Sequence, residues 1–185
     1  MTSPYDWFAD WVEDHVMVTL TATRGPDAAR LLAEFGRYGF DQGERTLDAT
    51  YALYEPTVRI GSAGAWVYAV EPSTVHGGDP AFSQRLTADG GDALAFCLTA
   101  TIRALHHCRD GEYVFGVDID LPHVRWGRDE HAYDQQMADA GLLTRDGPRP
   151  VAAAAGFVDR VFGFPVSRGM LEARLPCATV RPIGG

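Results

Sequence analysis

The chain has 185 residues, of which 46% are hydrophobic and 22% are charged, and its formal net charge is -9. This composition is that of an ordinary globular domain, which excludes a disordered or membrane-spanning chain, and the acidic balance argues against nucleic acid as a partner. All 16 basic residues are Arg, and the absence of Lys excludes Schiff-base chemistry and a Walker-type phosphate site.

Capping residues and apolar periodicity predict helices near both ends of the chain. Ser3 and Pro4 are suited to begin the first helix, and Trp7, Phe8 and Trp11 form its apolar stripe. The predicted helices cover residues 3–14, 27–36, 79–90, 129–141, 151–163 and 167–174.

Runs of apolar and β-branched residues predict strands in the middle of the chain. The predicted strands cover residues 16–22, 57–60, 65–71, 93–99, 101–108 and 112–120. Residues 37–56 have no clean period and are expected to form a loop with a short helical turn. This order predicts one α+β domain over residues 1–175 with a mostly antiparallel central sheet, followed by a loose tail over residues 176–185.

Cysteine usage and the N-terminal sequence indicate a reducing compartment. Cys97, Cys108 and Cys177 are an odd number without a C-x-x-C pair, which is typical of free thiols. The N-terminal residues lack the basic and apolar regions of a signal peptide, and no apolar run reaches the roughly 20 residues of a membrane span. We therefore expect a cytoplasmic protein that does not bind membranes.

A hairpin with Asp110-Gly111 at its tip is the place where the sequence predicts geometry. Counting back from the tip places Arg103 opposite Asp118 and His107 opposite Val114. Because side chains alternate along a strand, the two faces of the hairpin separate. The predicted core face carries Ile102, Ala104, His106, Cys108, Tyr113, Phe115, Val117 and Ile119. The predicted polar face carries Thr101, Arg103, His107, Arg109, Glu112, Asp118 and Asp120.

The polar face has two interpretations. It is either a solvated face with cross-strand ion pairs, or the floor of a pocket with His107 as a general base and Asp118 or Asp120 as its partner. Although Asp-x-Asp can hold a divalent cation, two aspartates are a weak signal. His106 and His107 point to opposite faces, so we expect no metal site, and no sequence motif predicts a cofactor.

Two further groups of residues are candidates for a binding site. Glu71 ends an apolar strand, where an acid invites an Arg partner, and His76 lies in the loop that follows. Residues 122–131 are either a recognition surface or a lid packed by one Trp, because Trp and Arg are favoured at interfaces. The candidates in this segment are His123, Arg125, Trp126, Arg128 and His131.

Several short motifs together carry a resemblance to a known family. They are Trp7–Trp11, Gly64-Ala65-Trp66, Val70-Glu71-Pro72, Leu86-Thr87-Ala88, Asp110-Gly111, Arg125-Trp126-Gly127 and Met137-Ala138-Asp139-Ala140-Gly141-Leu142. From about residue 5 to residue 172 the chain resembles domain-of-unknown-function family 6461, whose members are small proteins of high-GC bacteria. Ser73-Thr74 stand where such proteins often have Asn-Gly. The resemblance supports the domain boundaries and supplies no catalytic residues.

These observations favour a small binding or accessory protein, similar to immunity proteins, that acts through protein–protein interaction at residues 122–131. A protein partner is therefore favoured, with Trp126 expected to be partly exposed. The alternative is a small-molecule-binding protein or enzyme that uses His107, Asp118 and Asp120, with Glu71 near them. Trp66, at the start of an apolar strand, is expected to be buried in either case.

Overall fold

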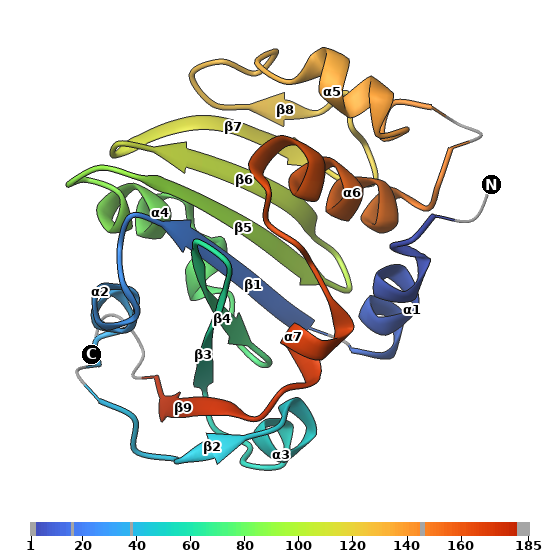
Figure 1. The fold of residues 1–185 in the computed structure, drawn as a ribbon. Helices are drawn as coiled ribbons and strands as arrows, with labels where there is room; N and C mark the ends of the chain where they lie inside the picture. Colours follow the sequence, from blue (N-terminus) through green and yellow to red (C-terminus); the bar gives the residue numbers. More distant parts are fainter. Residues whose placement is uncertain (1–2, 16, 38, 145–146, 181–185) are drawn as a thin grey trace.

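The computed structural model describes residues 3–15, 17–37, 39–144 and 147–180, so Val16 of the first predicted strand lies outside the described residues (Figure 1). The helices are α1 (Asp6–Asp14), α2 (Ala28–Glu34), α3 (Leu47–Tyr51), the 3-10 turn η1 (His76–Gly78), α4 (Pro80–Leu86), α5 (Asp134–Asp139), α6 (Pro150–Phe162) and α7 (Arg168–Glu172). The strands are β1 (Met17–Arg24), β2 (Glu44–Arg45), β3 (Thr57–Ala63), β4 (Trp66–Glu71), β5 (Asp92–Thr99), β6 (Arg103–Arg109), β7 (Glu112–Asp118), β8 (Arg125–Trp126) and β9 (Leu175–Thr179).

All described strands belong to one sheet in the order β2-β9-β3-β4-β1-β5-β6-β7-β8, and each neighbouring pair is antiparallel. This arrangement confirms the predicted α+β class. The sheet is strongly twisted and carries helices on both faces (Figure 1). The strand β1 lies at the centre of the order and pairs with β4 on one side and β5 on the other.

Each face of the sheet supports its own hydrophobic core. The larger core packs α1, α6 and α7 against side chains such as Leu20, Trp66 and Phe96. The smaller core packs α2 and α4 against the opposite face, with Phe35 and Phe82 in contact. Because both faces are covered, the strands are buried almost throughout, and their side chains do not divide into one apolar and one solvated set.

Several helix signals in the sequence act as expected, but the prediction that Ser3 begins the first helix is wrong, because α1 begins at Asp6 with Tyr5 at its N-cap and no side chain capping it. Asp27 caps α2 by accepting from the backbone N–H of Arg30 at 2.8 Å, and Asp79 caps α4 by accepting from Ala81 at 2.9 Å. Pro150 opens α6, and Gly163 ends it in the left-handed conformation at φ 67°. These contacts confirm the starts of α2 and α4 and both ends of α6.

The predicted register of the β6–β7 hairpin is wrong beyond its tip. Asp110-Gly111 does form the tip, and Arg109 faces Glu112. A bulge at Val114 then shifts the pairing by one residue, so that His107 faces Phe115 and Ala104 faces Asp118. The pairing of Arg103 with Asp118 and of His107 with Val114 is therefore not formed.

The bulge is stabilised by a segment that follows later in the chain. The backbone N–H groups of Arg128 and Asp129 donate to the carbonyls of Tyr113 and Val114, at 3.0 and 2.9 Å. Residues 128–133 then form turns, in which Ala132 donates to the carbonyl of Asp129 and Asp134 to that of His131. The predicted helix at 129–141 therefore begins regular α structure only at Asp134.

The expectation of a loose tail after Pro176 is wrong for the residues that are described. Residues 175–179 form β9, which pairs with both β2 and β3. Cys177 and Ala178 are buried, and Val180 donates to the carbonyl of Pro56 at 2.8 Å. The strand completes the sheet beside β3, while residues 181–185 lie outside the described part of the chain.

Candidate functional site

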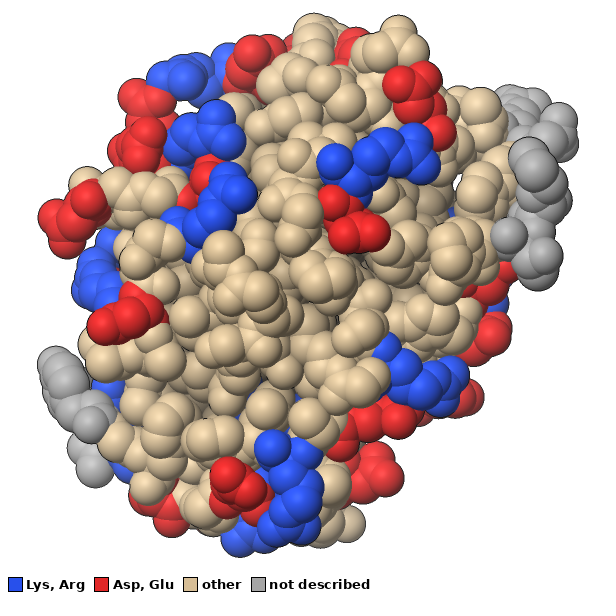
Figure 2. All heavy atoms as spheres, in the orientation of Figure 1, with Lys and Arg blue, Asp and Glu red and all other residues tan. Residues whose placement is uncertain are grey.

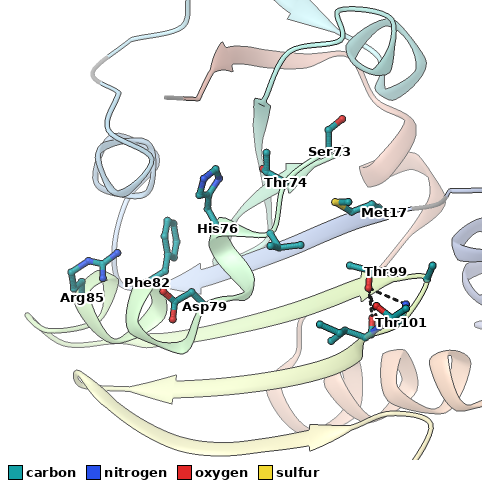
Figure 3. A pocket seen from close by; sticks show the side chains of 12 residues that line it. Met17, Ser73, Thr74, His76, Asp79, Phe82, Arg85, Thr99 and Thr101 are labelled. Carbon is teal, nitrogen blue, oxygen red and sulfur yellow. Dashed lines mark hydrogen bonds between the residues drawn. The ribbon is translucent and has the colours of Figure 1, made fainter. Parts of the chain in front are cut away.

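A large cleft lies on the α4 face of the sheet, between the start of η1 and the turn that joins β5 to β6 (Figure 3). Its volume is about 920 Å³. The cleft is lined by Met17, Ser73, Thr74, Val75, His76, Asp79, Phe82, Arg85, Thr99, Ala100, Thr101 and Ile102. These residues come from β1, from the segment between β4 and α4, from α4 itself, and from the β5–β6 turn.

Apolar side chains form much of the wall of this cleft. Val75 and Ile102 are 44% and 54% exposed, although both are large aliphatic residues. Met17 lies beside them on the wall, and Phe82 at its other end is buried in the α4 core. Exposed aliphatic side chains that share one concave surface are typical of a site that is covered when a ligand binds.

A buried carboxylate fixes the loop at one end of the cleft. Glu71 is fully buried, and its side chain accepts from the Thr74 hydroxyl at 2.6 Å, from the His76 backbone N–H at 3.0 Å and from the Gly77 backbone N–H at 2.8 Å. An ionised carboxylate needs several donors when it is removed from water. The predicted Arg partner of Glu71 is wrong, since backbone amides and a hydroxyl take that place.

The His76 ring lies above this carboxylate. Its Nδ1 atom is 3.4 Å from Glu71 Oε2, and the side chain is 22% exposed at the cleft wall. The pKa of His76 is raised above its ordinary value, because interaction with the Glu71 carboxylate favours the protonated ring more than partial burial opposes it. In Figure 3 the ring projects from the start of η1 between Phe82 and Thr74.

Two glycines allow η1 to lie directly on the sheet. A Cβ atom at Gly77 would overlap Thr21 Oγ1 and lie 2.8 Å from Glu71 Oε1, while a Cβ at Gly78 would lie 3.0 Å from the Cys97 sulfur. Both positions therefore require the close backbone approach that glycine permits. The sequence His76-Gly77-Gly78 thus fixes the histidine at a defined height above β1 and β5.

The His76→Gln variant should lose a pH-dependent part of the stability. A raised folded pKa means that the stabilisation from His76 is fully present below the unfolded value of 6.5 and is lost as the pH rises through the folded value. The difference in unfolding free energy between wild type and the variant should therefore be larger at about pH 6 than at about pH 9. Urea unfolding at both pH values measures it, and an equal difference at both would contradict the Glu71–His76 interaction.

The structure separates the residues of the predicted catalytic face. His107 is buried in the larger core, with Nε2 at 3.1 Å from Asp92 Oδ1 and Nδ1 at 3.0 Å from the Tyr133 hydroxyl. Burial lowers its pKa despite the neighbouring carboxylate. Asp118 pairs with Ala104, so these two side chains lie on the same face of the sheet. Ala104 and His107 are three residues apart on β6 and therefore point to opposite faces. Asp118 thus lies on the face opposite to that of His107.

The other members of the predicted polar face stabilise local structure. Asp118 accepts from the backbone N–H groups of Asp120 and Leu121, both at 2.9 Å. Asp120 lies 3.6 Å from Arg103 as a partly exposed ion pair. Arg109 and His107 instead share Asp92 with Arg24. Burial raises the pKa of Asp92, but hydrogen bonds from these three partners outweigh it and hold the pKa at about 2.

Part of the predicted recognition segment lines a second cleft of about 590 Å³. Asp120, His123 and Arg125 lie on one side of it, and Leu142 and Leu143 lie on the other. His131 is placed nearby through Arg125, because both contact Asp134. Arg128 points elsewhere and pairs with Glu112.

Trp126 is half-buried, as expected for a partly exposed residue. Its ring packs on His106 at 5.8 Å between centroids. His106 Nδ1 lies 2.6 Å from the Tyr113 hydroxyl, and burial lowers the pKa of His106 to about 4. Trp126 therefore packs beside the partly buried His106–Tyr113 pair near the edge of the sheet and does not form a lid over His107.

Sequence reasoning named Glu71 and His76 separately and missed the cleft that the fold builds around them. Met17, Val75 and Ile102 are ordinary apolar residues in three distant parts of the chain. The signal that was available locally is the pair of glycines after His76, which predicts close packing of that loop on a neighbouring element.

Two absences apply to the part of the chain that the structure describes. Within it, no three His, Cys, Asp or Glu residues lie close enough together to hold a metal ion. Every helix in the described ranges is too short or too polar to cross a membrane.

No protein-family model, curated protein or solved structure matches the chain. The resemblance to domain-of-unknown-function family 6461 therefore stays a prediction.

Proposed function

We propose that this chain is a small-molecule-binding protein whose site is the cleft between η1 and the β5–β6 turn. The observation that carries the proposal is the His76 ring at the wall of a mainly apolar cleft, in a loop whose His76 and Gly77 backbone N–H groups donate to the buried Glu71 carboxylate. Ligand sites in proteins typically combine an apolar lining with a few fixed polar groups in this way.

The size and composition of the cleft support this proposal. Its volume of about 920 Å³ lies within the range of roughly 300–1,000 Å³ that drug-sized ligands occupy. The Ser73 and Thr101 hydroxyls lie at its edge and can accept or donate hydrogen bonds. The site replaces the predicted one around His107, Asp118 and Asp120, and it retains Glu71 from that earlier set.

The distribution of charge also supports a ligand other than a nucleic acid. In the view of Figure 2, Arg side chains lie next to acidic ones around the rim, and uncharged residues cover much of the centre. A protein that binds a phosphate backbone instead needs basic residues gathered on one surface. The charge distribution thus argues against a nucleic acid, while the lining of the cleft favours a small, mainly apolar ligand.

Ile102→Asp should weaken the binding of a neutral apolar probe by about 10-fold or more, because it places a charge on the apolar wall. The measurement is fluorescence titration with N-phenyl-1-naphthylamine, an uncharged naphthalene dye. Leu121→Asp is the matched control, since Leu121 is 51% exposed but lies outside the cleft. Loss of binding in both variants, or in neither, would exclude this cleft as the site.

A second candidate function is protein–protein interaction at residues 121–131, and one specific observation favours it. Leu121, Val124 and Leu143 are all exposed large aliphatic residues, and they lie on or beside the second cleft with His123 and Arg125. An apolar surface with an Arg beside it suits a protein partner. The Leu121→Asp variant should then weaken the capture of that partner while dye binding stays normal.

A further inference from the structure

We infer that the ligand of the cleft is a small organic acid with an apolar body, whose carboxylate pairs with the His76 ring. This inference rests on the proposed function, because it names the ligand class of the same site. It draws on the polar atoms that the cleft leaves free, on the charges around them and on the shape of the apolar wall.

The two nitrogens of the His76 ring have different surroundings. Nδ1 faces the Glu71 carboxylate at 3.4 Å, so Nε2 is the ring atom left to meet a ligand. When the ring is protonated, both nitrogens carry a hydrogen, and Nε2–H can donate to an acid while Nδ1–H faces Glu71. An oriented cationic donor of this kind forms a strong hydrogen bond with a carboxylate.

Two acidic side chains, Glu71 and Asp79, carry the negative charges that could repel such an acid. The Glu71 carboxylate is buried beneath His76, and three donors from the loop already surround it. Asp79 uses one carboxylate oxygen to cap α4. Arg85 also lines the cleft, and its guanidinium forms an ion pair with Glu34 at 3.1 Å. Cys97 below Gly78 is an uncharged thiol, since burial raises its pKa.

Apolar side chains of the cleft are available to contact the body of the ligand. Val75, Ile102 and Met17 supply apolar side chains to the lining of the cleft that His76 also lines. The Thr99 hydroxyl, beside this wall, is used internally, because it accepts from the backbone N–H groups of Thr101 and Ile102 at 3.2 and 2.9 Å. The turn is thereby held in place, and Ile102 supplies its large apolar side chain to the cleft lining.

Together these groups distinguish an acid from a neutral molecule of the same shape. The apolar wall would hold both equally, whereas only the acid gains the charged hydrogen bond to His76. Because this bond requires the protonated ring, the preference for the acid should decline as the pH rises. The cleft is therefore expected to bind an apolar ligand more tightly when one end of that ligand carries a negative charge.

The experiment compares decanoate with decanamide, which have the same chain and differ in charge, as competitors for bound N-phenyl-1-naphthylamine. At about pH 6, decanoate should displace the dye at a concentration about 10-fold lower than decanamide, and the preference should fall at about pH 9. His76→Gln should remove the preference, while His131→Gln, an exposed histidine outside the cleft, should retain it.

The outcomes separate the two proposals. Equal displacement by decanoate and decanamide from wild type would overturn the acid ligand while leaving the proposed function intact. Failure of the dye to bind wild type would overturn the proposed function, and the inference with it. A preference for decanoate that survives in His76→Gln would overturn the role of His76. Proton NMR uses wild type alone and is therefore free of folding defects in a variant. In this measurement, decanoate should shift the His76 ring signals more than decanamide does.

Discussion

Replacement of Trp66 by Ala should lower the free energy of unfolding by about 3–5 kcal/mol. Trp66 is 2% exposed and begins β4 in the larger core, where its ring packs against Phe164 at 5.6 Å between centroids. The Arg24 guanidinium lies 5.0 Å from the same ring. Since a domain is stable by only about 5–15 kcal/mol, this one truncation could remove a large part of its stability. Urea unfolding followed by circular dichroism measures the loss.

Trp126→Ala provides the matched control, because it removes the same side chain from a half-buried position at the sheet edge. Its effect on the unfolding free energy should be clearly smaller than that of Trp66→Ala. If the two variants were equally stable, the assignment of Trp66 to the centre of the core would be wrong.

Glu71→Gln should lower the free energy of unfolding by about 1.5–3 kcal/mol, because a carboxylate that accepts charge-assisted hydrogen bonds is replaced by an amide. The amide has a single acceptor oxygen for the donors on Thr74, His76 and Gly77, and its NH₂ group would face donors. The same change should lower the pKa of His76, which the carboxylate holds above its ordinary value. Chemical denaturation and an NMR titration of the His76 ring measure the two effects.

Glu112→Gln serves as the control for this variant, since Glu112 is an exposed acid paired with Arg128. Its effect on stability should stay within about 0.5 kcal/mol. A Glu71→Gln protein that matched wild type in both stability and His76 pKa would show that the carboxylate does not organise the loop.

Much of the fold could be predicted from local signals in the sequence. Asp27 and Asp79 stand directly before apolar helical runs, and Gly163 stands directly after one, so the starts of α2 and α4 and the end of α6 were readable. The hairpin tip at Asp110-Gly111 was also readable, because both residues adopt the positive φ that an Asp-Gly turn favours.

The bulge at Val114 could not be predicted, because its cause lies far along the chain. Val114 has the composition of an ordinary strand residue, and only the amides of Arg128 and Asp129 reveal why its strand departs from regular pairing. A one-residue shift moves every later side chain to the other face. The predicted partnership of His107 and Asp118 failed for this reason.

The candidate site was only partly predictable for a related reason. Glu71 and His76 are five residues apart, so their proximity is compatible with the sequence, but the donors to Glu71 are mostly backbone groups that carry no sequence signal. Met17 and Ile102 reach the cleft because β1 pairs with β5 and β5 with β6. Their meeting depends on the strand order rather than on any local pattern.

The two outermost strands of the sheet have a consequence for how the chain behaves at high concentration. β2 and β8 each contain only two residues, Glu44–Arg45 and Arg125–Trp126, and each includes at least one charged side chain. Long, flat sheet edges recruit strands from other molecules, whereas short and charged edges offer few free backbone groups for such pairing. Backbone hydrogen bonds from neighbouring loops occupy further groups on the outer edges of β7 and β9. Fewer edge groups of these strands are therefore free to pair with another molecule, which opposes the growth of intermolecular sheets and hence aggregation.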